Sequence, residues 1–244
     1  MQIILGVLAA LAGYLIGSIP SGWVIVKILT GKDIRAIGSG RVGGTNAMRA
    51  AGLLAGALTA ALDILKGIGA GALAGLLVPG DPWVRLVAVC FTVWGQIHSI
   101  FLAERTENGK LRLRGGAGGA TALGGAIALW PQAWMVILPI GVFVYIVVGY
   151  ASVTTISVAF VSLVTLGYRA VTGEGPWAYS LYGVFALVAV LYALQPNLER
   201  LRNGTERSVG LRALREKQAA LKARISKSAR RPGHKKTTKS SASA

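Results

Sequence analysis

Long apolar stretches alternate with short polar segments along the chain, and this pattern predicts helices that span a membrane. A helix needs roughly 20 apolar residues to cross a bilayer. Six stretches meet or approach that length, and they occupy residues 3–28, 51–78, 83–103, 131–149, 152–170 and 177–194. A seventh, at residues 117–130, is apolar but short and rich in Gly and Ala. It is either a short or tilted span or a re-entrant piece packed inside the protein.

Composition agrees with this interpretation. Hydrophobic residues make up 53% of the 244 residues and charged residues only 14%, whereas soluble domains carry about 25% charged residues. The first stretch has no positively charged segment before it and is longer than the core of a signal peptide, so we expect it to be retained as the first span.

The distribution of charge predicts how the chain crosses the membrane. Segment 30–50 holds four basic residues against one acidic residue, and segment 104–116 holds four against two. Seven crossings with an outside N-terminus place both segments and the basic C-terminus on the cytoplasmic side, as the positive-inside rule requires. The sequence therefore predicts an all-α polytopic membrane protein with about seven transmembrane helices and a cytoplasmic C-terminus.

The composition of the C-terminal part predicts two regions. Residues 1–203 would form a membrane-embedded domain, and residues 204–244 would form a separate basic tail. From Glu199 onward there are fourteen Lys and Arg residues but only three Glu residues. Leu211, Leu214, Leu221 and Ile225 fall on one helical stripe, which is typical of an amphipathic helix at a membrane surface. From residue 226 we expect disorder. Because no aromatic residues accompany the charges, anionic lipid is the expected partner rather than nucleic acid.

Two glycine-rich segments on the cytoplasmic side are predicted to be loops that bind phosphate. The first, residues 38–49, combines Gly residues with Ser39, Thr45, Asn46 and Arg49. The second, residues 114–121, contains Arg114, Gly115 and Gly116 before an apolar segment. Glycines let backbone N–H groups turn toward an anion, and arginine adds a fork that matches a phosphate.

Asp63 and Lys66 lie three positions apart within a predicted span, so they share one helix face. Either they form a structural ion pair, or Lys66 adds positive charge beneath an anion site. His98 and His234 are the only histidines and Cys90 is the only cysteine. We therefore expect neither a metal site nor another cofactor.

The order and spacing of three motifs resemble those of the bacterial acyl-phosphate-dependent glycerol-3-phosphate acyltransferases. The first motif covers residues 17–22, 38–49 and 62–67. The second covers Gly95, residues 101–102 and residues 114–116, and the third covers residues 197–201 and 204–206. The resemblance extends from Gly17 to Glu206 and leaves only the basic tail outside.

This resemblance implies an enzyme of the bacterial plasma (inner) membrane, with its active site facing the cytoplasm. It would transfer an acyl group from acyl phosphate to glycerol 3-phosphate, giving lysophosphatidic acid and phosphate for phospholipid biosynthesis. By matching position, the catalytic residues would be Ser39, Arg49 and Asn197. The substrate-binding residues would be Gly43, Thr45, Asn46, Lys66, Arg114, Gly115 and Gly116.

The chain departs from the family pattern at several positions, as a divergent member would. These are Arg41 where the family usually has Asn, Gln96 and Leu194 where it usually has His, and Ala117 where it usually has Lys. A polar insertion at about residues 104–113 precedes the second glycine segment. Arg41 or Lys110 could replace the cation that is missing at Ala117.

Two alternatives to an acyltransferase stay open at this point. One is a catalytically degenerate paralogue that binds a phosphorylated lipid or regulates an active homologue, which the departures favour. The other is a transporter of a small anion that uses Asp63 and Lys66. An internal repeat would support a transporter, but the sequence contains none.

Overall fold

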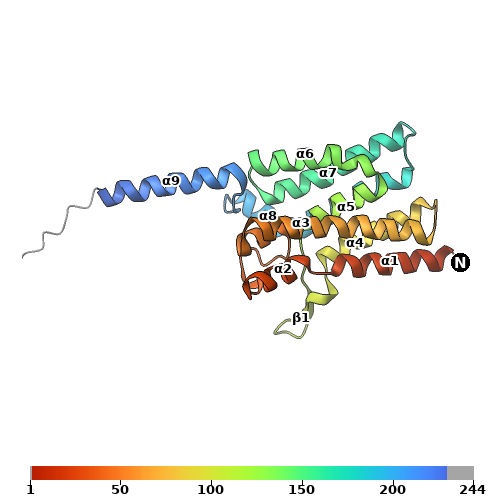
Figure 1. Cartoon of the computed structure of the whole chain (residues 1–244), viewed down its shortest axis with the longest axis horizontal. Helices are drawn as coiled ribbons and strands as arrows, with labels where there is room; N and C mark the ends of the chain where they lie inside the picture. Colours follow the sequence, from red (N-terminus) through yellow and green to blue (C-terminus); the bar gives the residue numbers. More distant parts are fainter. Residues whose placement is uncertain (1, 230–244) are drawn as a thin grey trace, which may run out of the picture.

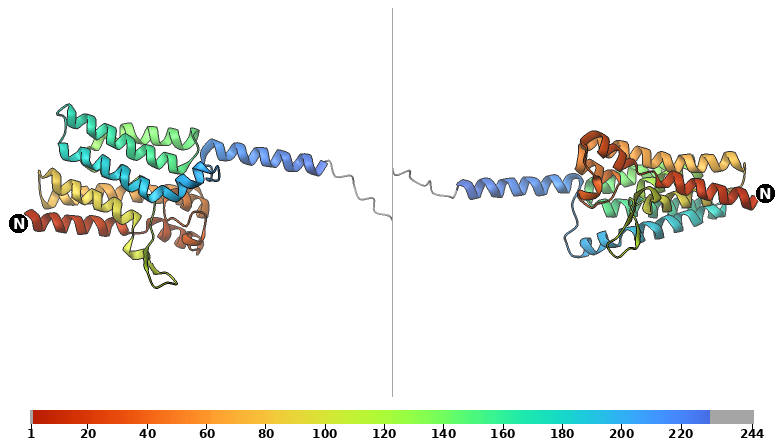
Figure 2. Two further views of the ribbon diagram at one scale, coloured as in Figure 1. Left: turned by 180° about the vertical axis from the view of Figure 1, so that it is seen from behind. Right: turned by 90° about the horizontal axis from the view of Figure 1, so that it is seen from below.

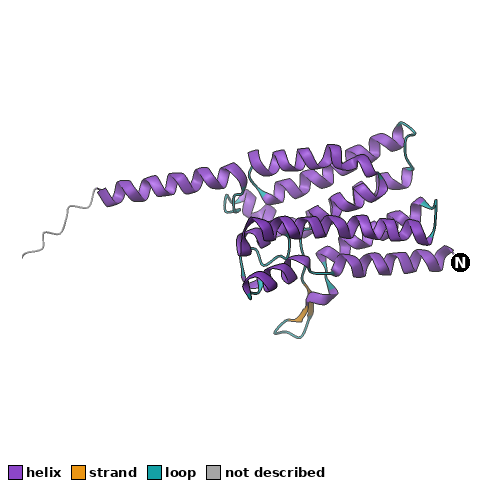
Figure 3. Ribbon diagram, viewed as in Figure 1, coloured by secondary structure: helices purple, strands orange, loops and turns teal. Residues whose placement is uncertain are grey.

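The described part of the protein is helical apart from one small hairpin (Figure 3). The computed structural model describes residues 2–229. Its helices are α1 (Gln2–Ser18), α2 (Ser21–Thr30), α3 (Gly44–Leu77), α4 (Pro82–Ile97), α5 (Gly119–Leu129), α6 (Trp134–Val147), α7 (Ala151–Val171), α8 (Trp177–Arg202) and α9 (Gly210–Ala229). Three short 3-10 helices are η1 (Ile34–Ala36), η2 (Ile100–Leu102) and η3 (Pro131–Ala133). The antiparallel strands β1 (Ala103–Arg105) and β2 (Leu111–Leu113) form the hairpin.

Within residues 2–229, five segments are long and apolar enough to cross a membrane. They are Ile3–Thr30, Gly44–Leu77, Pro82–Leu102, Ala151–Val171 and Trp177–Arg202. Two further apolar helical segments, Gly119–Leu129 and Pro131–Val147, are shorter. Large apolar side chains are exposed along the bundle, for example Leu76, Phe143 and Val188. An apolar outer surface of this extent is compatible with lipid and not with water, so the predicted polytopic membrane fold is confirmed.

The span predicted at residues 3–28 implies one continuous helix, but the first apolar stretch forms two. It divides into α1 and α2 at Ile19 and Pro20. Proline has no N–H group and interrupts the helical hydrogen bonds. At the interruption the Ile19 carbonyl accepts hydrogen bonds from the N–H of Ser21 and from the ammonium of Lys66. The break therefore supplies a backbone partner for a charge buried in the bundle.

The first glycine segment is only partly a loop, which corrects the prediction for residues 38–49. Helix α3 already begins at Gly44, so Thr45, Asn46 and Arg49 lie on helical turns. The helix is then interrupted at Ala51 and Gly52, where Gly52 has φ 88° and ψ 177°. Few residues other than glycine adopt that conformation. A short helical segment with polar side chains thus precedes the long apolar part of α3.

Helices α3 and α5 pack closely through small residues. A methyl group added at Gly124 of α5 would overlap the carbonyl of Ile64, and one added at Gly67 of α3 would overlap the backbone of α5. Further along, Gly71 faces Ala128, so the two helices run in the same direction. Helix α5 consequently begins level with the middle of α3, and its residues from Thr121 to Ala126 are buried.

The polar segments gather toward one end of the bundle. The N-terminus lies at one end, whereas the start of α3, the end of α8 and the base of α9 lie at the other (Figure 1). The reverse view shows the same arrangement, with the β hairpin projecting from the side (Figure 2). Chain segments that are distant in sequence therefore meet where the first glycine segment lies.

Candidate functional site

A cavity of about 540 Å³ opens among α3, α5, α6, α7 and α8. One part of its lining is polar, and these side chains come from the first glycine segment, the end of α8 and the turn after it. They are Ser39, Arg41, Thr45, Asn46, Arg49, Asn197 and Glu206. The remainder is mostly apolar and includes Leu53, Ile64, Leu138, Val142 and Val158. The cavity therefore joins a polar end to an apolar channel between membrane helices.

The Asn46 side chain organises the polar end of the cavity. Its amide oxygen accepts from the backbone N–H of Ser39 at 3.2 Å, and its nitrogen donates to the carbonyls of Ile37 and Arg41, each at 2.9 Å. Asn46 is only 2% exposed. These bonds fold the glycine segment back onto the first turn of α3. They also present the side chains of Ser39 and Arg41 to the cavity.

Two arginines give the cavity its positive charge. Arg49 lines the cavity from the first turns of α3, and within residues 2–229 it forms no ion pair. Arg41 enters from the preceding loop and donates one N–H to the Ala193 carbonyl of α8. Burial and the positive charge of Arg200 lower the pKa of Arg41, while Glu206 opposes that shift. Arg41 thus occupies a site that favours an additional negative charge.

The end of α8 contributes Asn197 and, through the following turn, Glu206. The Asn197 amide donates to Glu206 at 2.7 Å, and Arg200 forms an ion pair with the same carboxylate at 3.2 Å. Glu206 belongs to the third motif but was not among the predicted site residues. Its membership of the same motif as Asn197 and Arg200 was the available signal.

Three buried polar atoms of the cavity lining have no hydrogen-bond partner in the described part of the chain. They are Nη1 of Arg41, Oδ1 of Asn197 and Oγ of Ser152. Buried polar groups are nearly always hydrogen-bonded to protein or to water, so these three atoms are available to a ligand or a water molecule in the cavity. Ser152 was not predicted, because no glycine-rich or charged motif surrounds it in the sequence.

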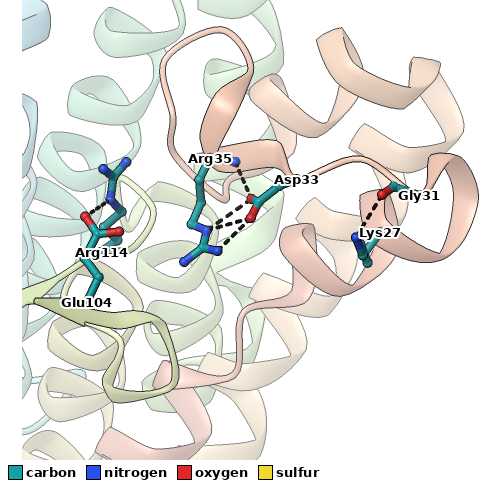
Figure 4. Close-up of polar contacts among 6 residues, drawn as sticks. All are labelled: Lys27, Gly31, Asp33, Arg35, Glu104 and Arg114. Atoms are coloured by element: carbon teal, nitrogen blue, oxygen red, sulfur yellow. Dashed lines mark hydrogen bonds and ion pairs between the residues drawn. The ribbon is translucent and has the colours of Figure 1, made fainter.

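The second glycine segment is near the cavity, but its predicted anion-binding residues do not line it. The Arg114 guanidinium pairs with Glu104 of the β hairpin, close to the ion pair of Arg35 and Asp33 (Figure 4). Gly115 accepts from the N–H of Val42, and Gly116 donates to the carbonyl of Gln96 at 2.7 Å. These three residues connect the first glycine segment to α4.

The cavity is instead reached by the next residues, Ala117, Gly118, Gly119 and Ala120. Gly118 caps α5 with φ 84°, a left-handed conformation suited to glycine. The first N–H groups of a helix have no partner within it and carry a partial positive charge. The start of α5 therefore faces the cavity with an end that favours anions.

Lys66 and Asp63 form a buried network with Gln96. The Lys66 ammonium donates to Asp63 at 2.7 Å and to Gln96 at 2.8 Å, and Gln96 donates back to Asp63 at 2.9 Å. Together with the Ile19 carbonyl, these contacts use all three N–H groups of Lys66. Asp63 and Gln96 line the cavity, whereas Lys66 does not. The network holds α3, α4 and the break after α1 together.

Two of the departures noted in the sequence lie in the same apolar cluster. Leu194 is buried with Ala159 and Val190, and Ala117 packs against this cluster. Both residues also line the cavity. This wall therefore presents hydrocarbon to the cavity.

The arrangement is suited to an amphiphile that carries a phosphate. The apolar channel can take a long chain, and the arginines, the Asn197 amide and the start of α5 can bind an anion and a hydroxyl. Within residues 2–229 no group of three or more His, Cys, Asp or Glu side chains is placed to hold a metal ion.

Known proteins share both the sequence and this fold. Residues 7–204 match the family model of glycerol-3-phosphate acyltransferase. The glycerol-3-phosphate acyltransferase of Rubrobacter xylanophilus is 39% identical over 210 residues, which are 86% of this chain and 98% of that protein. Glycerol-3-phosphate acyltransferase 2 of Moorella thermoacetica is 36% identical over 84% of this chain and 98% of its own length.

A crystal structure of the integral membrane glycerol 3-phosphate acyltransferase PlsY in its glycerol 3-phosphate form superposes with a TM-score of 0.71. It is 30% identical, and the match covers 86% of this chain and 98% of that one. The lysophosphatidic acid form of PlsY gives a TM-score of 0.68 at 28% identity, over 86% of this chain and 96% of that one. With a family model matched across most of its length and relatives aligned nearly end to end, this chain belongs to the glycerol-3-phosphate acyltransferase family.

Proposed function

We propose that the protein transfers a fatty acyl group from acyl phosphate to a hydroxyl of glycerol 3-phosphate. The observation that carries this proposal is a cavity in which an apolar channel meets a polar, arginine-lined end. Both substrates carry a phosphate, and only the donor carries a long chain. The relatives' names and the glycerol 3-phosphate form of PlsY support the acceptor.

The residues divide between the two substrates. The acyl chain lies in the channel formed by α3, α6 and α7. Arg49 binds a phosphate, and Ser39 and Thr45 hydrogen-bond the acceptor beside it. The free Oδ1 of Asn197 accepts from the attacking hydroxyl. Asn46, Gly43, Gly115 and Gly116 shape the backbone around these groups, and Lys66 positions Asp63 and Gln96.

The chemistry needs little beyond orientation and electrostatic stabilisation. The acceptor hydroxyl oxygen attacks the acyl carbonyl carbon, the new C–O bond forms, and the C–O bond to phosphate breaks. A phosphate oxygen of the donor takes the hydroxyl proton, so hydrogen phosphate leaves and lysophosphatidic acid remains. The N–H groups at the start of α5 stabilise the negative charge that develops in the transition state.

The proposed orientation places this chemistry at the cytoplasmic face of a bacterial plasma membrane, with seven crossings that include α5 and α6. The basic segments at the start of α3 and in the hairpin support it. In a Cys90→Ser background, a cysteine replacing Glu107 should react with a membrane-impermeant maleimide only in permeabilised cells. A cysteine replacing Gly80 should react in intact cells, and the reverse pattern would refute this orientation.

The tail, residues 204–244 in the proposed division, would contact anionic lipid through α9. Leu211, Leu214, Leu221 and Ile225 of α9 are all more than 40% exposed. Basic residues flank this stripe on the helix. An exposed apolar stripe with cationic borders matches the chemistry of an anionic membrane surface. Residues 230–244, where most of the predicted disorder falls, lie outside the described residues.

The enzyme assay tests the proposal directly. Purified protein in lipid nanodiscs is mixed with a long-chain acyl phosphate and glycerol 3-phosphate, and lysophosphatidic acid and phosphate are measured together. Equal amounts of both products are expected. Acyl thioester as donor and glycerol as acceptor serve as comparisons. Binding of both substrates without product formation would overturn the proposal in favour of a degenerate paralogue.

A further inference from the structure

The protein neutralises the carboxylates that line the cavity, but it does not neutralise the arginines that line it. The lining contains two carboxylates, Asp63 and Glu206, and both have cationic partners, Lys66 and Arg200. In the part of the chain that the structure describes, neither Arg41 nor Arg49 has a carboxylate partner. The cavity is therefore ready to accept more than one negative group.

Arg41 is held in a defined position within this cavity. One of its terminal nitrogens, Nη2, donates to the carbonyl of Ala193 in α8. The other, Nη1, is buried and has no partner among residues 2–229. A guanidinium is a planar fork whose charge is shared between these nitrogens. Anchoring one nitrogen on the backbone therefore fixes where the free one points.

Arg41 supplies the positive charge beside the cavity wall that contains Leu194 and Ala117. Leu194 follows the Ala193 anchor in α8, and it packs with Ala117 in an apolar cluster. Arg114 is engaged by Glu104 outside the cavity lining. An anion on this side of the cavity would therefore find its positive contact in Arg41.

We propose that Arg41 is a substrate-binding residue, whose free Nη1 donates charge-assisted hydrogen bonds to the phosphate of one of the two substrates. Arg49 would serve the phosphate of the other. This assignment rests on the proposed acyl transfer. It explains how the site can hold two phosphate groups close together.

Kinetics of Arg41→Gln test the assignment, because glutamine keeps a polar side chain but removes the charge and the fork. Loss of a charge-assisted hydrogen bond should raise the KM for one substrate by roughly 10- to 100-fold. A change in the KM for acyl phosphate assigns Arg41 to the donor, and one for glycerol 3-phosphate assigns it to the acceptor. Arg105→Gln, on β1 and outside the cavity lining, is the matched control and should leave both values unchanged.

Binding without turnover gives an independent readout. Calorimetry with glycerol 3-phosphate alone, and with a non-hydrolysable acyl phosphonate alone, should show weaker binding of the ligand whose KM has risen. Unchanged KM values and affinities, within twofold, in a folded Arg41→Gln variant would overturn the proposal.

Two further variants keep the test decisive if Arg41→Gln unfolds in detergent. Arg41→Lys retains the charge but loses the fork, so it should bind with an affinity between those of wild type and a neutral variant. Ala117→Lys adds a cation to the same wall and should recover part of the affinity that is lost in the Arg41→Lys variant. Wild-type affinity in Arg41→Lys, with no effect of Ala117→Lys, would refute a phosphate contact. A wild-type protein without acyltransferase activity would instead refute the proposed function.

Discussion

At the scale of single residues, the site is organised by which charges the protein neutralises and which it leaves free. Asp63 and Lys66 satisfy one another with the help of Gln96 and the Ile19 carbonyl. Arg49 has no such partner in the described chain, although it occupies the same cavity as Asp63. Arg49 is half-buried and unpaired within residues 2–229, so it is available to a substrate, as Arg41 is.

Replacing Arg49 with Ala should abolish acyl transfer. The variant loses a bidentate donor for phosphate, and the catalytic efficiency kcat/KM is expected to fall at least roughly 100-fold. The rate of lysophosphatidic acid formation measures the effect, with Arg105→Ala as a control on the hairpin. Transfer at the wild-type rate would contradict the role of Arg49.

Removing Lys66 should destabilise the protein more than removing the whole ion pair. Lys66→Met leaves the Asp63 carboxylate buried without a cation, which costs about 3–5 kcal/mol. The double variant Asp63→Leu/Lys66→Met removes both charges and should recover part of that loss. Thermal unfolding in detergent compares the two, and equal unfolding temperatures would contradict this account.

At the scale of elements, the cavity depends on how closely α5 approaches α3. Gly124 contacts the backbone of α3, and Gly67 contacts the backbone of α5. In lipid, where water does not drive helices together, small residues at the interface allow this close packing. The same contact sets the depth at which α5 begins, and hence the position of its first N–H groups.

Gly124→Val should separate α3 from α5 and lower both stability and activity. Its side chain would overlap the Ile64 carbonyl, and overpacking of this kind costs about 1–3 kcal/mol. The control is Gly69→Val on the same helix as Gly67, because an added Cβ there meets nothing within 4 Å. Melting temperature and specific activity are measured for both. Equal losses in the two variants would show that close packing is not the cause.

At the scale of the whole molecule, α9 extends from the end of the bundle at which α8 ends (Figure 1). Its base is attached, because Val209 is buried and Ser208 pairs with Tyr150 before α7. Beyond this point the apolar stripe is uncovered. The residues beside the stripe, Arg215, Lys217, Lys222 and Arg224, are all cationic and would repel the same helix of a second copy. An anionic lipid surface therefore matches the stripe and its cationic borders better than a second copy of the helix does.

A fluorescent probe on α9 tests lipid contact. In a Cys90→Ser background, a polarity-sensitive dye at Leu221→Cys should shift to the blue in nanodiscs with anionic phosphatidylglycerol, relative to phosphatidylcholine. High salt should reduce the shift because it screens the attraction. The same dye at Ala223→Cys, on the opposite face of the helix, is the control. Equal spectra in both lipids would contradict the contact.

The sequence by itself determined the membrane class, because the apolar stretches are long and charges are almost absent from them. It also proposed Arg49 and Asn197 as site residues from their positions in the resembling motifs, and both line the cavity. Residues without such local surroundings, such as Ser152, were not identifiable. Glu206 lay within a motif, but its contact with Asn197 arises only when the chain turns back after α8.

Only the tertiary structure decided which polar groups face the cavity and which satisfy one another. Arg114 and Lys66 carry the charge that a phosphate site needs, yet the first pairs with Glu104 and the second with Asp63. Arg41 is a departure from the family motif in sequence, but folding brings it to α8 with one nitrogen free. Sequence states which side chains can bind an anion, whereas their availability depends on partners that distant segments supply.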